Sequence, residues 1–266
     1  GYLAPGFKDI DLQGGGFEYE ASVIIPCKNR VRTIGTAIKS ALSQVVKAPY
    51  KFNVIVVDDN SEDGSVDVIK SIVAEGHENL VYIAQDKTWH AIGGNWNVAL
   101  HHEKCGRFAI QLDSDDTYFD ENTVQKFIDA FHEQNCAMVV GTYQLTDFDG
   151  NLIPPGVIDH KEWTPDNGRN NALRIHGLGA PRGFYTPMLR TINFPTTKYG
   201  EDYAVGLRVS REYQIGRIYD VVYNCRRWDD NSDANCDIVT MNNNHLYKDR
   251  IRTWELKARI QMNEGK

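Results

Sequence analysis

Three carboxylates crowd into one short stretch of the chain, Asp113-Ser114-Asp115-Asp116, directly after the apolar run 108–112. An apolar strand that runs into clustered carboxylates brings anionic oxygens to the end of a sheet, where they can hold a divalent cation. Hard cations prefer oxygen ligands, and Mg²⁺ is commonly bound by one or two carboxylates together with substrate phosphates. The cluster therefore favours a metal-bound nucleotide diphosphate, although a polar turn and helix cap would explain the same residues.

Two further acidic pairs invite a similar interpretation. The strand-like residues 52–57 end in Asp58-Asp59, and Glu201-Asp202 opens a segment with helical spacing. A polar strand-to-helix turn accounts for the first pair without any ligand. The helix macrodipole favours acidic residues in a first turn by about 0.3–1 kcal/mol, which accounts for the second pair. The meaning of both pairs depends on where the fold places them.

The elements that must position these residues alternate regularly in the first half of the chain. Apolar runs predict strands over 21–25, 52–57, 80–84 and 108–112, the first of them ended by Pro26. Apolar residues recur at helical spacing over 34–45, 66–73, 95–104 and 124–131. This alternation predicts an α/β fold with right-handed βαβ units and a mainly parallel sheet, whose ligands bind beyond the carboxyl ends of the strands. The acid-rich loops after the strands should therefore open on one edge of the sheet.

The second half of the chain is less regular. After a strand over 137–143, residues 150–193 are rich in Gly, Pro, Asn and Arg with little periodicity, which is typical of recognition loops. A helix from Glu201, a strand over 215–223 and a helix over 244–262 follow. The arginines and lysines of the last helix are expected to solvate it rather than to bind anything.

Composition narrows the class of protein. The chain has 266 residues, 41% of them hydrophobic and 24% charged, which fits one large globular domain with elaborations. Its formal charge of -7 argues against a surface dedicated to nucleic acid. No apolar run approaches the roughly 18 residues of a membrane helix, and residues 1–6 lack the regions of a signal peptide. Five cysteines without a Cys-x-x-Cys pair indicate neither a disulfide framework nor a zinc site, so we expect a reducing, cytoplasmic compartment.

Four motifs in their order resemble family 2 glycosyltransferases of the GT-A fold. They are SVIIPCKN at 22–29, VVDDNSEDGS at 56–65, LDSDD at 112–116 and GED at 200–202. The resemblance implies a Rossmann-like nucleotide-diphospho-sugar transferase domain with a mainly parallel sheet flanked by helices. That domain is expected over 21–230, divided into a nucleotide-sugar-binding half at 21–143 and an acceptor-binding half at 144–230. Residues 1–20 would be an N-terminal extension and residues 231–266 a C-terminal helical extension.

The resemblance also implies a role for each motif. The first two would hold the donor nucleotide through Pro26, Lys28, Asp58 and Asp59. We expect uridine, because a carboxylate can accept the imide proton of uracil. Ser114 would be a further donor contact, Asp113 would lie near the ribose, and Asp115 with Asp113 would bind Mn²⁺ or Mg²⁺. Asp202 would be the general base that removes the proton of the acceptor hydroxyl in an inverting displacement.

Two places depart from the family pattern. Many relatives carry Ala-Arg-Asn ahead of the metal motif, where the Arg helps to hold the nucleotide, but Trp96 takes the Arg position here. Lys87 could supply the missing positive charge, and Trp96 also fits the core. The run NCRRW at 224–228 resembles the Gln-x-x-Arg-Trp of processive polysaccharide synthases. Arg227 or Arg226 would clamp the diphosphate or an anionic acceptor, while Trp228 would stack on a sugar or pack at the strand end.

His176 is a candidate third metal ligand, and His160 and His245 are also eligible. The expected partners are a UDP-sugar donor and a glycan, lipid-linked or other hydroxyl acceptor, with no nucleic acid. A location at the inner face of a membrane is compatible with such an acceptor. We expect acceptor choice to reside in residues 150–195 and 225–236.

Two other functions fit parts of the same pattern. A sugar-phosphate nucleotidyltransferase would share the fold and the metal carboxylates, but it should open with a Gly-rich phosphate loop, which residues 26–30 do not resemble. A catalytically silent binding module would explain Trp96, whereas the presence of Asp113, Asp115 and Asp202 together speaks against it. Metal-dependent hydrolysis of a donor would separate an active transferase from a silent module.

Overall fold

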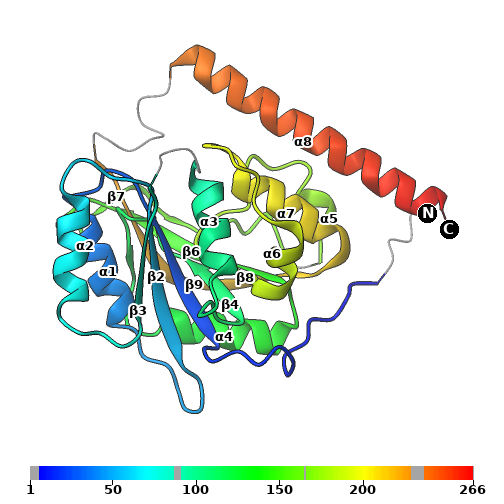
Figure 1. Cartoon of the computed structure of the whole chain (residues 1–266). Coiled ribbons are helices and arrows are strands. Elements are labelled where there is room, and N and C mark those ends of the chain that lie inside the picture. Colours follow the sequence, from blue (N-terminus) through cyan, green and yellow to red (C-terminus); the bar gives the residue numbers. More distant parts are fainter. Residues whose placement is uncertain (1–5, 87–90, 165, 229–236, 266) are drawn as a thin grey trace.

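The computed structural model describes residues 6–86, 91–164, 166–228 and 237–265 and is drawn in Figure 1. The strands are β1 (Ala21–Cys27), β2 (Phe52–Asp58), β3 (Leu80–Ala84), β4 (Phe108–Gln111), β5 (Thr117–Tyr118), β6 (Met138–Thr146), β7 (Leu152–Ile158), β8 (Arg182–Tyr185) and β9 (Ile215–Arg226). The helices are α1 (Ile34–Leu42), α2 (Ser65–Val73), α3 (Ala91–His101), α4 (Thr123–Gln134), α5 (Gly168–Asn171), α6 (Thr186–Ile192), α7 (Glu201–Glu212) and α8 (Ile238–Glu264).

The first four long strands form the parallel half of the sheet, in the order β3-β2-β1-β4. Every residue of β1 is buried, because the strand has neighbours on both sides and helices over both faces. A strand buried in this way reads as a continuous Val/Ile run rather than as an alternating pattern. The predicted α/β sheet with βαβ units is confirmed for this half of the chain.

One detail of β1 differs from the prediction. The strand does not end at Pro26 but continues to Cys27, with Pro26 opposite Val57 of β2. The carbonyl of Ile24 accepts a hydrogen bond from Leu112 on the β4 side, so the nitrogen of Pro26, two residues on, faces that side as well. Pairing with β4 has already stopped at Ile24, and the missing N–H of proline therefore breaks no ladder hydrogen bond.

The second half of the sheet is mixed. β8 is antiparallel to both β4 and β6, while β6 is parallel to β9. β5 pairs antiparallel with β9, and β7 pairs antiparallel with β6. The expectation of irregular loops over 150–193 was wrong for these residues, since β7, α5, β8 and α6 lie there. β8 was missed because its four residues, Arg-Gly-Phe-Tyr, are too short to show a period.

Helices cover both faces of the sheet. Successive residues of β8 point to opposite faces, and a Cβ on Gly183 would lie 2.7 Å from Phe127 of α4. The ring of Phe184 packs on the other face against Trp96 of α3, with ring centroids 5.8 Å apart. Gln44, just beyond α1, accepts a hydrogen bond from Val124 of α4, which places α1 and α4 on one face. α3 contacts both α6 and α7 on the opposite face.

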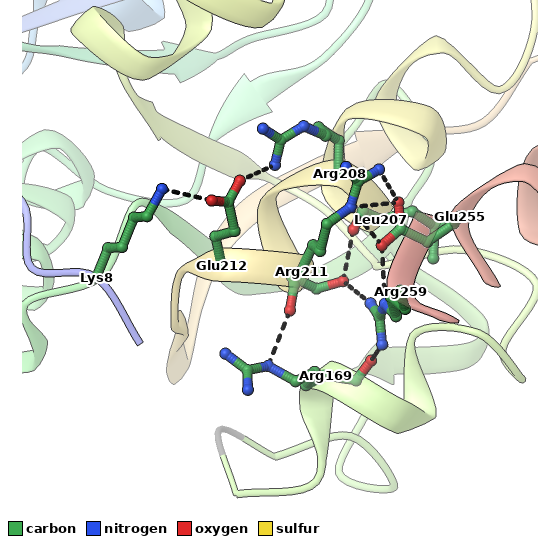
Figure 2. Close-up of polar contacts among 9 residues, drawn as sticks. Lys8, Arg169, Leu207, Arg208, Arg211, Glu212, Glu255 and Arg259 are labelled. Carbon is green, nitrogen blue, oxygen red and sulfur yellow. Dashed lines mark hydrogen bonds and ion pairs between the residues drawn. The ribbon is translucent and has the colours of Figure 1, made fainter. Parts of the chain in front are cut away.

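α8 lies outside both helical layers. Figure 1 shows it running past α7 as the outermost element on that side of the domain. Its contact with α7 is polar: the buried Glu255 carboxylate accepts hydrogen bonds from Arg211 Nη2 at 2.7 Å and from Arg259 Nε at 2.8 Å (Figure 2). Arg259 also donates to Ser210 Oγ and to the carbonyl of Arg169. Within the described ranges, no helix combines the length and the apolar character needed to cross a membrane.

The expectation that the basic residues of this helix only solvate it was wrong for three of them. Arg259 belongs to the buried cluster around Glu255. Arg252 donates to the hydroxyl of Tyr203 and to the carbonyl of Ile175. Lys248 donates to the carbonyl of His176. These side chains fasten α8 to the domain, and a sequence pattern could not show this because these partners lie 49 to 90 positions away.

Candidate functional site

Two cavities meet at the carboxyl edge of the parallel strands. Their volumes are about 560 Å³ and about 420 Å³, and Ile92 and Lys198 line both of them, so the two spaces adjoin. The charged residues that line the larger cavity are Asp113, Asp115, Asp116, Arg182, Lys198, Glu201, Asp202, Arg227 and Lys248.

The smaller cavity collects residues predicted to bind the nucleotide. Pro26, Lys28, Asp59 and Ser114 all line it, although they come from three different strand ends. Asn95 of α3 lines the same space and was not singled out in the sequence. A possible signal was its place next to Trp96, at the position where many relatives carry the Ala of Ala-Arg-Asn.

The loops that frame the smaller cavity are bonded to each other. The Asn29 N–H donates to Ser61 Oγ at 2.8 Å, and the Glu62 N–H donates to Asn29 Oδ1 at 2.9 Å. Lys28 Nζ donates to the Asn60 carbonyl at 2.5 Å. These bonds tie the β1–α1 loop to the β2–α2 loop, so the walls of the cavity are set before any ligand arrives.

Asp58 does not line the smaller cavity. Its side chain is buried in the strand end, and its Oδ2 accepts the N–H of Ser61 at 3.0 Å. This is the polar turn that the sequence also allowed. The structure thus gives Asp58 a place in shaping the loop and leaves Asp59 as the carboxylate at the cavity wall.

The acidic loop after β4 is held from three sides. Gln111 Nε2 donates to both oxygens of Asp113 at 3.0 Å, and the Asp113 N–H donates to the hydroxyl of Tyr223 at 3.0 Å. The backbone N–H of Arg226 donates to Asp116 Oδ1 at 2.8 Å, and its Nε donates to the Asp115 carbonyl at 2.7 Å. Burial raises the pKa of Asp113, and burial raises the pKa of Asp116 well above its usual range.

Asp113 and Asp115 provide oxygen donors at the larger cavity, and such donors fit a hard divalent cation. Asp115 Oδ2 also accepts a hydrogen bond from Trp228 Nε1 at 3.3 Å and lies 3.9 Å from Arg30 Nε. The structure does not bring His176 into a ligand set with these carboxylates. Among the residues that the structure describes, no group of three or more His, Cys, Asp or Glu side chains is arranged to hold a metal ion.

Glu201 and Asp202 enter the larger cavity from the first turn of α7. Gly200 caps this helix with φ of 73°, a left-handed conformation that favours glycine. Asp202 forms an ion pair with Arg182 of β8, with 2.8 Å between Oδ2 and Nη1. The Arg182 N–H donates to Gln111 Oε1, so one glutamine orients both Asp113 and the arginine that holds Asp202.

Glu201 is nearly buried beside Asp202. Burial, followed by the negative charge of Asp202, raises the pKa of Glu201 to about 7. A close approach of α3 creates this environment: a Cβ on Gly93 would lie 2.0 Å from the Pro195 carbonyl and 3.4 Å from the Cβ of Glu201. Only a residue without a side chain allows α3 to pack so near the segment that leads into α7.

The remaining candidates separate into core and cavity. Trp96 is buried against Phe184 and Phe194, which makes it part of the core, as one of the two interpretations held. Arg227 lines the larger cavity, whereas Arg226 is buried and anchors the acidic loop. Lys87 lies outside the described residues.

The first half of α8 supplies a wall of the larger cavity that the sequence did not reveal. Met241, Asn244, His245 and Lys248 line the cavity from this helix. No sequence motif marks them, and their position follows only from the way α8 packs across α7. The sequence placed acceptor recognition in other segments.

Comparison with known proteins connects this geometry to a family. Residues 22–194 match the model of the family described as Glycosyl transferase family 2. A poly(ribitol-phosphate) beta-glucosyltransferase of Bacillus spizizenii is 26% identical over 213 residues, which are 77% of this chain and 32% of that protein. The Escherichia coli enzyme WfgD, a UDP-Glc:alpha-D-GlcNAc-diphosphoundecaprenol beta-1,3-glucosyltransferase, is 25% identical over 76% of this chain and 74% of its own length.

Solved structures share the fold. The crystal structure of S. aureus TarS 1-349 in complex with UDP-GlcNAc has a TM-score of 0.67 at 22% identity, over 89% of this chain and 71% of that one. The mannosyltransferase PcManGT of Pyrobaculum calidifontis, solved with GDP-Man and Mn²⁺, has a TM-score of 0.56 at 19% identity, over 81% and 59%. The chain spans about a third of the length of the Bacillus spizizenii relative.

Proposed function

The chain belongs to glycosyl transferase family 2, and from this premise we propose that it transfers a sugar from a UDP-sugar to a hydroxyl acceptor by metal-dependent inverting displacement. The observation that carries the proposal is the meeting of two cavities at one sheet edge. One cavity is lined by Pro26, Lys28, Asp59 and Ser114 of the predicted nucleotide residues, and the other is lined by Asp113, Asp115 and Asp202.

The donor would span both cavities. Its nucleoside would enter the smaller one against Pro26, Asn95 and Asp59, and its diphosphate and sugar would extend past Lys198 into the larger one. A uridine nucleotide is supported by one relative whose name includes UDP-Glc and by a fold neighbour solved with UDP-GlcNAc. Arg227 would contact the diphosphate from the wall of the larger cavity.

Asp113 and Asp115 would hold the cation. When bound there, Mn²⁺ or Mg²⁺ would neutralise the charge that develops on the departing nucleoside diphosphate. Fold neighbours solved with Mn²⁺ support this assignment. Gln111, which contacts both oxygens of Asp113, would orient that carboxylate toward the cavity.

Asp202 would be the general base. An ionised carboxylate at the cavity wall can accept the proton of an acceptor hydroxyl while the oxygen attacks the anomeric carbon on the face opposite the diphosphate. The ion pair with Arg182 keeps this carboxylate in one orientation. Glu201 lies next to it in a buried position and would help to place the acceptor hydroxyl.

The acceptor would be a polymer or a lipid-linked glycan. The names of two relatives contain poly(ribitol-phosphate) and diphosphoundecaprenol, and a third relative is named for teichuronic acid biosynthesis. These names support a role in making a cell-envelope polysaccharide. We place the reaction in the cytoplasm, at the inner face of the membrane.

Calorimetric titration of UDP in Mn²⁺ and in EDTA tests the proposal. We expect tighter binding with the metal, and Asp115→Ala should remove most of the difference because one remaining carboxylate holds the ion weakly. Asp149→Ala, an exposed aspartate outside both cavities, is the matched control. Equal affinity for UDP in Mn²⁺ and in EDTA would contradict the proposal. A screen of UDP-sugars for metal-dependent hydrolysis would then separate a transferase from a silent binding module.

A further inference from the structure

The wall that α8 contributes to the larger cavity faces the acceptor side. His245 and Lys248 line the larger cavity and not the smaller one. Tyr247 and Lys248 lie 3.2 Å and 3.9 Å from the position that a Cβ on Gly200 would take, directly ahead of Glu201 and Asp202. A group bound against this wall would therefore lie next to the proposed base and away from the nucleoside.

Lys248 gives this wall a positive charge, and no ion pair among the described residues includes it. Lys248 Nζ donates to the carbonyl of His176 and lies 4.7 Å from the centroid of the Tyr199 ring. A carbonyl oxygen and an aromatic face orient an ammonium group but leave its full charge in place. The rings of His245 and His176 pack together with their centroids 5.9 Å apart. The imidazole of His245 is therefore a second nitrogen-bearing side chain of this wall, beside Lys248.

Lys198 extends this charge toward the donor. It lies in the loop ahead of α7, lines both cavities, and forms no ion pair with any residue in the described ranges. The opposite side of the larger cavity carries the carboxylates of Asp113, Asp115 and Asp116. The cavity therefore has an acidic side suited to a metal and a basic side, formed by Lys198, His245 and Lys248, that adjoins Glu201 and the ion pair of Asp202 with Arg182.

The basic side is held in place by the polar docking of α8. Arg252, one turn beyond Lys248, donates to the Tyr203 hydroxyl at 2.9 Å and to the Ile175 carbonyl at 2.6 Å. Glu255, two turns beyond Lys248, binds Arg211 of α7. A site whose supporting residues are already ordered loses less conformational entropy when it binds a ligand.

We propose that His245 and Lys248 of α8 bind a phosphate group of the acceptor, so that the hydroxyl that receives the sugar lies close to a phosphate ester. This inference rests on the proposed function and names the acceptor's chemistry. Phosphate oxygens accept charge-assisted hydrogen bonds from an ammonium group and further hydrogen bonds from an imidazole N–H. A neutral glycan would leave the lysine without a counter-charge, and the site would discriminate against it.

The phosphate could belong to a polymer repeat or to a lipid diphosphate, and two probes separate these sources. Glycerophosphoglycerol represents a polymer phosphodiester, and geranyl diphosphate represents a lipid diphosphate. Each is titrated calorimetrically into the full chain saturated with UDP and Mn²⁺, which blocks the donor's own phosphate contacts. We expect one probe to bind and Lys248→Gln to weaken it by about fivefold or more.

Three variants control the measurement. Lys257→Gln changes an exposed lysine of the same helix that does not line the cavity, and it should leave the affinity for the probe unchanged. Lys248→Arg keeps the charge and should retain most of the binding, which guards against a folding defect of the glutamine variant. His245→Gln should weaken the same probe as Lys248→Gln does.

The proposal is overturned if neither probe binds better than glycerol, or if Lys248→Gln and Lys257→Gln bind the probe equally. It is also overturned if the probe binds only when UDP is absent, since the phosphate would then occupy the donor site. Failure of the chain to bind UDP at all would contradict the proposed function instead. The same titrations run without UDP would in that case still decide whether α8 binds phosphate.

Discussion

The carboxylate of Asp202 is held by an arginine rather than left to solvent. Arg182 reaches it from β8, a strand that the sequence pattern did not predict, and the pair is 2.8 Å apart at the wall of the larger cavity. A carboxylate held in this way keeps one orientation, as a proton acceptor must. If Asp202 only stabilises the start of α7, its substitution should not change the rate of sugar transfer, whereas a general base should be essential for that rate.

We expect Asp202→Asn to lower the rate of sugar transfer by about 10²–10⁴-fold while UDP affinity changes little, because the change preserves volume and removes only the proton acceptor. Steady-state transfer rates and calorimetric UDP titration measure the two effects. Asp67→Asn, in the first turn of α2, is the control for the helix dipole and should change neither. Loss of UDP affinity with unchanged turnover would make Asp202 a binding residue.

Glu201 should make stability depend on pH. Its pKa rises from 4.5 to about 7 in the folded chain, so the folded state binds this proton more tightly than the unfolded state does. The resulting stability is fully present below pH 4.5 and is lost as the pH rises through about 7. Glu201→Gln removes this contribution, so the free energy of unfolding of the parent should fall relative to the variant by up to about 3 kcal/mol over that range.

Denaturant unfolding of both proteins at a series of pH values measures the difference. Glu133→Gln, an exposed glutamate on α4, controls for the loss of a carboxyl group elsewhere and should give a curve parallel to that of the parent. Parallel curves for Glu201→Gln and the parent would show that Glu201 titrates normally.

At the scale of elements, α8 is joined to the domain mainly by polar contacts. Its buried residues are Ile251, Glu255 and Arg259, and the helix lies against α7. A buried charge is tolerated there because each partner satisfies the other. Removal of Glu255 would leave the guanidinium groups of Arg211 and Arg259 facing each other without a counter-charge.

We therefore expect Glu255→Ala to weaken the docking of α8 by about 3–5 kcal/mol, the usual effect of breaking one side of a buried ion pair. Hydrogen exchange followed by mass spectrometry should show faster exchange in α8, while β1 and β2 remain as protected as in the parent. Glu264→Ala, an exposed glutamate at the end of the same helix, is the matched control. Unchanged exchange in α8 would mean that other contacts hold the helix.

At the scale of the whole molecule, the proposed function assigns the donor nucleoside to one cavity and the acceptor to the other. The smaller cavity is built from the first half of the chain together with Lys198, and the larger one joins the acidic loop to β8, α7 and α8. The donor would bridge them. Substitutions in the lining of the smaller cavity should therefore affect nucleotide binding, and substitutions in the lining of the larger cavity should affect sugar transfer.

Arg182→Ala should reduce transfer while leaving UDP affinity within about 1 kcal/mol of the parent, because it touches Asp202 and not the smaller cavity. Asn95→Leu should instead weaken the binding of UDP, because the larger apolar side chain would fill part of the smaller cavity. Calorimetry and transfer assays on both variants decide the matter. The division fails if Arg182→Ala loses nucleotide binding and keeps its transfer rate.

The sequence by itself determined the elements whose patterns are local. Apolar runs predicted β1, β2, β3 and β4, and helical spacing predicted α1, α2 and α4, because buried strands and amphipathic helices each show a characteristic pattern of nearby apolar residues. The four motifs and their order predicted the family. The carboxyl ends of parallel strands meet at one edge of a sheet, so the predicted strands also predicted that Pro26, Asp59 and Asp115 lie together there.

The tertiary structure alone decided which distant residues meet. The pairing of Arg182 with Asp202 has no local signal. The different places of Arg226 in the acidic loop and of Arg227 at the cavity wall have none either. The same holds for α8, whose His245 and Lys248 reach the larger cavity through contacts with α7. Periodicity specifies which face of an element is buried, whereas the partner of that face is set by packing between segments far apart in the chain.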